Sequence, residues 1–241
     1  MTDIQAYDDS DTYNRFQALR PDYTGAINCA ISVTKRYSRG LERIALADFC
    51  AGTGTNTHRF ANEVGGITRA TLIDINAQFL ATALLSNINA RQIDAHCQDI
   101  LTVQLDKTYD LVFSFFAYHH VHDVDKPEFL KLARDCLLPH GKLILAEIYL
   151  GTKERSQMYY YKLFYSLPSE TKSPELKQFL TQTANSSDFE FKVEKCVADK
   201  HLRDAGFEIC EQQKIWPLDF VDSNMHENEG TFVQVFELRH K

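Results

Sequence analysis

Apolar runs typical of strands alternate with helix-type stretches through the middle of the chain. The strand-type runs cover residues 43–49, 70–75, 109–115 and 142–149. Each run is followed by a stretch whose apolar residues have helical spacing. Strands that alternate with helices are joined by right-handed crossovers and lie parallel in one sheet. The pattern therefore predicts an open α/β sheet with helices on both faces, which binds ligands at the carboxyl ends of its strands.

The two ends of the chain have different patterns of apolar and polar residues. Residues 12–38 predict one or two helices with a break at Pro21, because the residue before a proline disfavours the helical conformation. Residues 189–205 predict a further helix that ends at a glycine. Two alternating runs after it, 208–216 and 231–239, predict a pair of strands joined by a long connection.

These elements divide the chain into a core with two helical additions. Residues 43–151 and 187–241 form the predicted ligand-binding core, and residues 152–186 predict a helical cap inserted into it. Residues 1–42 predict a helical lid that orders over its ligand. Five side chains of this lid are suited to binding a carboxylate or covering a nucleoside: Tyr7, Tyr13, Arg15, Arg20 and Tyr23.

Composition and charge argue against several classes of function. The chain has 241 residues and a formal charge of −7, from 26 Lys and Arg against 33 Asp and Glu, and its basic residues are dispersed. A protein that binds nucleic acid usually has a basic patch, so we expect no nucleic-acid partner. The apolar runs are far shorter than the roughly 20 residues that cross a bilayer, and the N-terminus has no signal-peptide pattern. We therefore expect a cytoplasmic monomer or homodimer with no membrane partner and with reduced cysteines.

The most informative segment is the glycine-rich turn at residues 48–57, with the sequence DFCAGTGTNT, between the first strand and its helix. Glycines in such a turn let the backbone approach a ligand closely. A dinucleotide site of the form G-x-G-x-x-G would need a third glycine where this chain has Thr57. Asp48 instead stands at the strand end, four residues before Gly52. It suits a ligand that has an ammonium group and no phosphate there.

Polar residues also follow the next strands. Asp74 comes 20 residues after Gly54 and ends the second strand, where its carboxylate is able to bind two ribose hydroxyls. A nicotinamide site would use the same acid. Gln98-Asp99-Ile100 follows a third strand-type run, 92–97, and a loop with the sequence AYHHVHD, residues 117–123, follows the fourth strand.

Together with the Leu-Leu-Pro-His-Gly turn at 137–141, these motifs resemble those of class I S-adenosylmethionine-dependent methyltransferases of the small-molecule type. The resemblance extends over residues 43–150. It implies a doubly wound, mostly parallel, Rossmann-like seven-stranded sheet with an antiparallel last strand, and S-adenosyl-L-methionine as the cofactor. It also implies the cofactor-binding residues, which are Asp48, Cys50, Ala51, Gly52, Gly54, Asp74, Ile75, Asp99, Ile100 and Phe115. The residues alone also allow an alternative to a cofactor site, in which the glycines only form a tight turn and the acids are solvated.

In this family the methyl group passes by in-line displacement from a positively charged sulfur. Alignment does much of the catalysis, and a base is needed only when the acceptor carries a proton that must leave. The resemblance implies that the loop after the fourth strand faces the acceptor, and its candidate catalytic residues are Tyr118, His119 and His120. Histidines at this point also occur as packing or capping groups.

The same loop contains side chains of the types that bind metals: His120, His122, Asp123 and Asp125. They are crowded into six residues without a regular helical face. We therefore expect no bound metal.

Aromatic residues are the remaining signal, since five of the eleven tyrosines lie between positions 149 and 165. Ring faces attract cations, so these residues are able to line a pocket for the sulfonium or for an amine. A helix with this spacing of rings also packs on a sheet, which is the structural alternative. The candidate substrate-binding residues are Phe116, Tyr149, Tyr160 and Tyr161.

The sequence therefore predicts an enzyme that methylates an oxygen or a nitrogen of a small molecule. Residues 114–117 lack the Asn/Asp-Pro-Pro-Tyr motif of enzymes that methylate DNA adenine or glutamine amides. Three alternatives stay open. They are an enzyme that uses S-adenosylmethionine without methyl transfer, for example by closing its aminobutyrate chain into a ring, a nicotinamide-dependent oxidoreductase, and a non-catalytic ligand-binding module.

Overall fold

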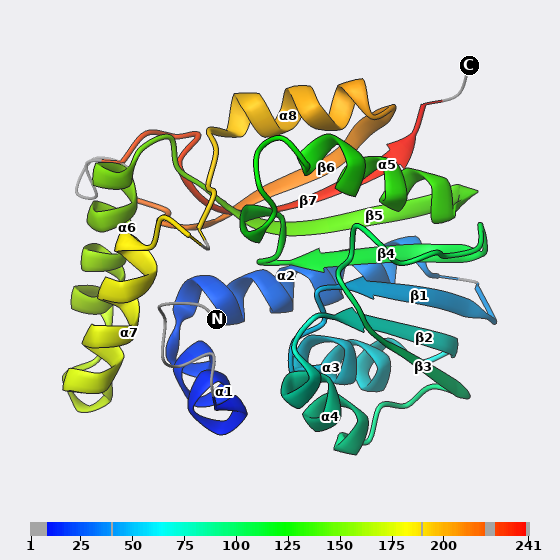
Figure 1. Ribbon diagram of the computed structural model, residues 1–241, viewed down its shortest axis with the longest axis horizontal. Helices are drawn as coiled ribbons and strands as arrows, with labels where there is room; N and C mark the ends of the chain where they lie inside the picture. Colours follow the sequence, from blue (N-terminus) through cyan, green and yellow to red (C-terminus); the bar gives the residue numbers. More distant parts are fainter. Residues whose placement is uncertain (1–8, 40, 189, 220–224, 240–241) are drawn as a thin grey trace.

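The fold is built on one mixed sheet with helices on both faces, as the computed structural model in Figure 1 shows. The structure describes residues 9–39, 41–188, 190–219 and 225–239. Among these residues, no helix combines the length and the apolar character that a membrane span requires.

The sheet has seven strands in the order β3-β2-β1-β4-β5-β7-β6. The strands are β1 (Ile44–Phe49), β2 (Ile67–Asp74), β3 (Gln92–Cys97), β4 (Tyr109–Phe115), β5 (Leu137–Tyr149), β6 (Phe207–Trp216) and β7 (Gly230–Leu238). Strand β7 runs antiparallel to both of its neighbours, β5 and β6, whereas the pairs from β3 to β5 are parallel. This arrangement confirms the predicted doubly wound sheet with an antiparallel last strand.

Helices cover the two faces and one end of the sheet. They are α1 (Ser10–Leu19), α2 (Pro21–Tyr37), α3 (Thr55–Val64), α4 (Ala77–Leu85), α5 (Lys126–Cys136), α6 (Lys153–Ser166), α7 (Pro174–Asn185) and α8 (Lys195–Asp204). Two short 3-10 turns lie at Tyr118–His120 and Ser169–Thr171. One apolar core lies between the sheet and α2, α3 and α4, and a second lies between the sheet and α5 and α8.

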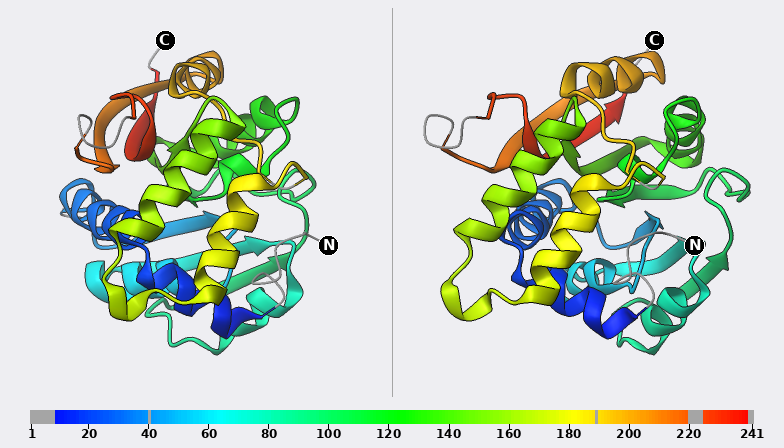
Figure 2. Two further views of the ribbon diagram at one scale, coloured as in Figure 1. Left: turned by 90° about the vertical axis from the view of Figure 1, so that its left-hand side faces the viewer. Right: turned by 60° about the vertical axis from the view of Figure 1, so that its left-hand side comes forward.

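Helices α6 and α7 pack against each other beyond the carboxyl ends of the parallel strands (Figure 2, left). Helix α1 lies at the same end and contacts the glycine turn and α4. Asn14 accepts a hydrogen bond from the Thr53 hydroxyl at 2.5 Å, and the rings of Tyr13 and Phe79 are 5.0 Å apart. Helices α1, α6 and α7 therefore cover the edge of the sheet where ligands are expected.

Three features of the core were not predicted from the sequence. Leu137 pairs with Tyr109 and Lys142 pairs with Leu111, so the Leu-Pro-Gly segment bulges inside β5 instead of preceding the strand. No helix forms between β3 and β4 within the described residues. Helix α8 begins at Lys195, and residues 190–194 before it form no regular secondary structure.

Candidate active site

The glycine turn between β1 and α3 uses its two glycines differently. Both have left-handed backbone angles, with φ of +56° at Gly52 and +70° at Gly54. A Cβ on Gly54 would lie 2.6 Å from the Cβ of Ala83, so this glycine allows α3 and α4 to pack closely. A Cβ on Gly52 would meet nothing nearer than Phe79, at 4.0 Å. The space beside Gly52 is therefore open to a ligand.

The residues just before these glycines shape the turn through their backbone. Cys50 also has a left-handed backbone, with φ of +58°. Burial raises the pKa of its thiol well above the usual value, so the thiol stays protonated. Ala51 N–H donates to the carbonyl of Ile73 at 2.9 Å, which ties the turn to the end of β2.

Asp48 at the end of β1 lies inside the turn and is only 2% exposed. Its Oδ2 accepts a hydrogen bond from the Thr57 hydroxyl. Burial raises the pKa of Asp48 to about 7, although the bond from Thr57 acts in the opposite direction. The threonine at the place of a third glycine thus serves to satisfy this buried acid.

Asp74 at the end of β2 reaches across to the glycine turn. Its Oδ2 accepts from Gly52 N at 2.7 Å and its Oδ1 accepts from Asn76 N at 2.8 Å. Burial raises the pKa of Asp74, and the two backbone bonds oppose that shift. The next residue, Ile75, is 71% exposed although it is a large apolar side chain. An acid held beside the open turn and an uncovered apolar side chain thus lie together at this edge.

The remaining residues expected to bind the cofactor lie at the ends of β3 and β4. Asp99 is exposed, and its Oδ1 accepts from Leu101 N at 2.9 Å. Ile100 beside it is buried in the core on the α5 side, and Phe115 is buried in the core on the α2 side.

His119 follows β4 and is held by a carboxylate from the end of β5. Its ring Nδ1 is hydrogen-bonded to Oε1 of Glu147, and its backbone N–H donates to Oε2 of Glu147 at 3.1 Å. Burial lowers the pKa of His119 well below its usual value and raises that of Glu147 to about 7. The imidazole is therefore neutral and donates a hydrogen bond from Nδ1–H to the carboxylate, which leaves the lone pair on Nε2 available.

A segment that the sequence did not indicate, residues 190–192, lies against this histidine. Oε2 of Glu190 is 3.6 Å from His119 Nε2 and forms an ion pair with Lys192. Phe191 N–H donates to the carbonyl of His119 at 2.7 Å. The buried Lys126 ammonium donates to the carbonyls of Val121 and Phe191, at 2.6 and 2.8 Å, and so ties the segment to the histidine loop.

Two of the predicted substrate-binding residues lie together beside a buried arginine. Arg20 forms an ion pair with Asp22 at 2.7 Å, and its guanidinium carbon is 5.8 Å from the Phe116 ring centre and 5.6 Å from that of Tyr160. Lys192 Nζ is 5.3 Å from the centre of the Tyr160 ring. Phe116 and Tyr160 therefore border the charged groups next to His119.

Side chains of the predicted lid reach the same region. Tyr23 stacks on Phe116 with ring centres 4.9 Å apart, and Tyr13 lies against Phe79. Arg15 is exposed, and its guanidinium lies over the ring of its neighbour Phe16. Tyr7 lies outside the described residues.

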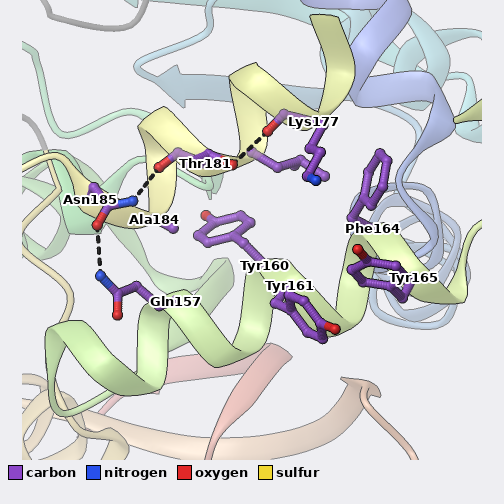
Figure 3. Close-up of a pocket in the computed structure, with 10 residues that line it drawn as sticks. Gln157, Tyr160, Tyr161, Phe164, Tyr165, Lys177, Thr181, Ala184 and Asn185 are labelled. Atoms are coloured by element: carbon purple, nitrogen blue, oxygen red, sulfur yellow. Dashed lines mark hydrogen bonds between the residues drawn. The ribbon is translucent and has the colours of Figure 1, made fainter. Parts of the chain in front are cut away.

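Three other tyrosines expected at the site lie elsewhere. Tyr118 is buried in the core on the α5 side with its hydroxyl 2.8 Å from His201 Nδ1. Tyr149 is buried in the same core, and its hydroxyl donates to Gln234 at 2.5 Å. Tyr161 is 63% exposed, and Figure 3 shows it directed away from α7, whereas Tyr160 is directed between α6 and α7. The alternation of side chains along a strand and around a helix turns these rings away.

Three side chains are close enough to hold a metal ion: His119, His120 and Glu190, whose ligand atoms lie within 4.8 Å of one another. Glu190 already forms an ion pair with the positively charged Lys192. The metal alternative considered from the sequence used another set. In that set, His122 is exposed and its ring lies 4.0 Å from that of Phe191, and Asp123 binds Lys126.

The fold and a family match agree on the type of protein. Residues 46–141 match the family described as a methyltransferase domain. The matched segment is a methyltransferase domain, and the enzyme type that it indicates uses S-adenosylmethionine as its cofactor. No protein of curated function matches the chain in sequence.

Several solved structures share the fold of this methyltransferase domain at low identity. The plantazolicin methyltransferase BpumL, in complex with S-adenosylhomocysteine, has a TM-score of 0.66 at 12% identity, over 98% of this chain and 94% of that one. A chain from a complex that contains the Haloferax volcanii Trm112 methyltransferase activator has a TM-score of 0.64 at 15% identity, over 100% and 99%. The Burkholderia thailandensis 1,6-didemethyltoxoflavin-N1-methyltransferase, with bound 1,6-didemethyltoxoflavin and S-adenosylhomocysteine, has a TM-score of 0.57 at 13% identity, over 89% and 79%.

Proposed function

We propose that this chain transfers the methyl group of S-adenosylmethionine to a small-molecule acceptor bound at the carboxyl end of its sheet. The observation that carries the proposal is the position of Asp74, whose carboxylate meets Gly52 beside an open turn and the exposed Ile75. An acid at this strand end is suited to the two ribose hydroxyls of the cofactor. An apolar side chain that is uncovered next to it is suited to the face of the adenine.

The cofactor would lie along four neighbouring strand ends. In this proposal the turn residues contact its methionine part, Asp74 its ribose, and Asp99 its adenine amino group, with Ile75 and Ile100 as apolar neighbours. The full proposed set is Asp48, Cys50, Ala51, Gly52, Gly54, Asp74, Ile75, Asp99, Ile100 and Phe115.

The acceptor would occupy the space bordered by Phe116 and Tyr160, next to the histidine loop. His119 is our proposed proton acceptor, because its neutral imidazole is held by Glu147 with Nε2 directed away from that carboxylate. His120 is its immediate neighbour, with ring centres 4.1 Å apart. We do not include Tyr118, Tyr149 or Tyr161 in this site, since their contacts lie elsewhere.

We propose that the segments covering this end act as a lid and a cap, and that residues 43–151 and 187–241 form the core. Helices α6 and α7 would enclose the acceptor, and α1 would close over the cofactor. The small molecule bound by the didemethyltoxoflavin methyltransferase, which has the same fold, supports a small-molecule acceptor.

Binding of S-adenosylhomocysteine tests the cofactor site. Asp74→Ala is expected to weaken binding by about 1.5 to 3 kcal/mol, because hydrogen bonds to a charged group are lost. Isothermal titration calorimetry measures the change, and Asp106→Ala is the control, since Asp106 is an exposed acid before the amino end of β4. Equal affinities of wild type and Asp74→Ala would contradict the proposal.

Mass spectrometry of the products tests the reaction. A methylated acceptor together with S-adenosylhomocysteine is the expected result. If 5′-methylthioadenosine and a cyclised amino acid appeared instead, the enzyme would close the aminobutyrate chain of the cofactor and the methyl-transfer proposal would be wrong.

A further inference from the structure

Glu190 has a buried carboxylate oxygen that lacks a hydrogen-bond donor among the described residues. The side chain is 3% exposed, and Oε2 is paired with Lys192, but Oε1 has no partner. Burial by itself would raise the pKa of Glu190, yet the ammonium of Lys192 beside it lowers the pKa, so the carboxylate is ionised. A buried ionised oxygen without a donor is costly. It is therefore suited to receive an N–H or O–H group from a ligand.

The strong charges around this oxygen are paired with each other. Arg20 is paired with Asp22, and Lys192 is paired with Glu190, so these four charges cancel in two pairs. The remaining acid, Glu147, is hydrogen-bonded to the neutral His119, and burial raises its pKa to about 7. The ionised Glu190 would repel an anion, so a ligand that brings a cationic N–H group is favoured over a negatively charged one.

Aromatic rings lie beside these charged groups. Tyr160 and Phe116 already present their ring faces to the guanidinium of Arg20, and Tyr160 does so to the ammonium of Lys192. Such faces attract cations through the negative charge of the ring surface.

We propose that the acceptor is an amine, and that Glu190 binds its nitrogen and determines the specificity of the enzyme for N-methylation. This inference rests on the proposed methyltransferase function. It selects one of the two atoms, oxygen or nitrogen, to which that function would transfer the methyl group.

The step conserves atoms and charge. The bound ammonium group gives one proton to Nε2 of His119. This nitrogen lies 3.6 Å from Oε2 of Glu190, the carboxylate oxygen that is paired with Lys192. The lone pair of the amine then forms a bond to the methyl carbon as the bond between that carbon and sulfur breaks. The electron pair of the broken bond stays on sulfur, which gives S-adenosylhomocysteine and a methylated ammonium product.

The test compares three probes that share one skeleton: phenethylamine, 2-phenylethanol and 3-phenylpropionate. Calorimetry measures the binding of each to the protein saturated with S-adenosylhomocysteine. We expect phenethylamine to bind at least tenfold more tightly than the other two in the wild type, and Glu190→Gln to abolish this preference. Glu208→Gln, which changes an exposed glutamate on β6, should keep it.

Each alternative outcome is decisive. No preference for the amine, or the same preference in Glu190→Gln, would overturn the inference. Stoichiometric binding of zinc chloride that is lost in Glu190→Gln would also overturn it, because His119, His120 and Glu190 would then be a metal site. The affinity for S-adenosylhomocysteine is measured first in each protein. If the wild type did not bind S-adenosylhomocysteine, the proposed function would be contradicted. If it bound S-adenosylhomocysteine but showed no preference for the amine, only this inference would be contradicted.

Discussion

At the scale of single residues, Gly52 and Gly54 of the glycine turn have different neighbours, so their substitutions should have different effects. Alanine at either position meets the cost of a left-handed backbone, about 1 to 2 kcal/mol. At Gly54 the added Cβ would also lie 2.6 Å from that of Ala83, which adds roughly 1 to 3 kcal/mol of overpacking. At Gly52 it would point into open space.

We therefore expect Gly54→Ala to lose more folding stability than Gly52→Ala, and Gly52→Ala to lose more affinity for S-adenosylhomocysteine. Urea unfolding measures the stability, and calorimetry measures the affinity. Each variant is the control for the other. Two variants with equal stability and equal affinity would show that the turn does not distinguish a packing glycine from a ligand-facing one.

At the scale of elements, α1 contacts the cofactor side of the sheet and the cap. Asn14 binds Thr53 of the turn, and Ser10 lies 3.2 Å from the hydroxyl of Thr82 on α4. Phe16 of the same helix stacks on Phe179 of α7 with ring centres 5.3 Å apart. A helix that borders a ligand site in this way gains order when the ligand is bound.

Amide hydrogen exchange over residues 10–19 should consequently slow when S-adenosylhomocysteine is added. Helix α8, residues 195–204, serves as the internal reference because it packs on the far side of the sheet from α1 and α2. If exchange in α1 were the same with and without ligand, α1 would be a packing element and the lid proposal would be wrong.

At the scale of the whole molecule, Asp48 makes stability depend on pH. Its pKa of about 7 in the folded state lies above the ordinary value of 3.8, so the folded state holds a proton that the unfolded state releases. Stability contributed by this group is present below about pH 4 and is lost as the pH rises towards 7. Glu147 acts in the same direction, and His119, whose pKa is lowered, acts in the opposite direction.

Asp48→Asn removes this one contribution while it keeps an oxygen that accepts from Thr57. Relative to the wild type, the variant should gain stability between pH 5 and pH 7, by at most about 1.4 kcal/mol for each pH unit. Urea unfolding at a series of pH values measures the difference. A difference between the two proteins that stays constant with pH would mean that Asp48 is ionised in the folded state.

The main features of the sheet are predictable because strand and helix periods are local properties of the sequence. The run at 92–97 coincides with β3, and the break at Pro21 separates α1 from α2. The bulge in β5 was not predictable, because it depends on how Tyr109 pairs across the sheet. The position of Tyr149 depends on the face of β5 that it occupies, and Tyr118 lies in a 3-10 turn whose orientation no period of the sequence specifies.

The sequence by itself determined the parallel α/β sheet, the glycine turn and the acids at the ends of β1, β2 and β3, because each is a short motif attached to a periodic element. Only the tertiary structure brought Arg20, Glu147 and Glu190 to the histidine loop. These residues come from α1–α2, β5 and an extended segment, and no spacing along the chain relates them. The cofactor motif is therefore local, whereas the acceptor site is formed by distant segments that meet because the crossovers bring them to one edge of the sheet.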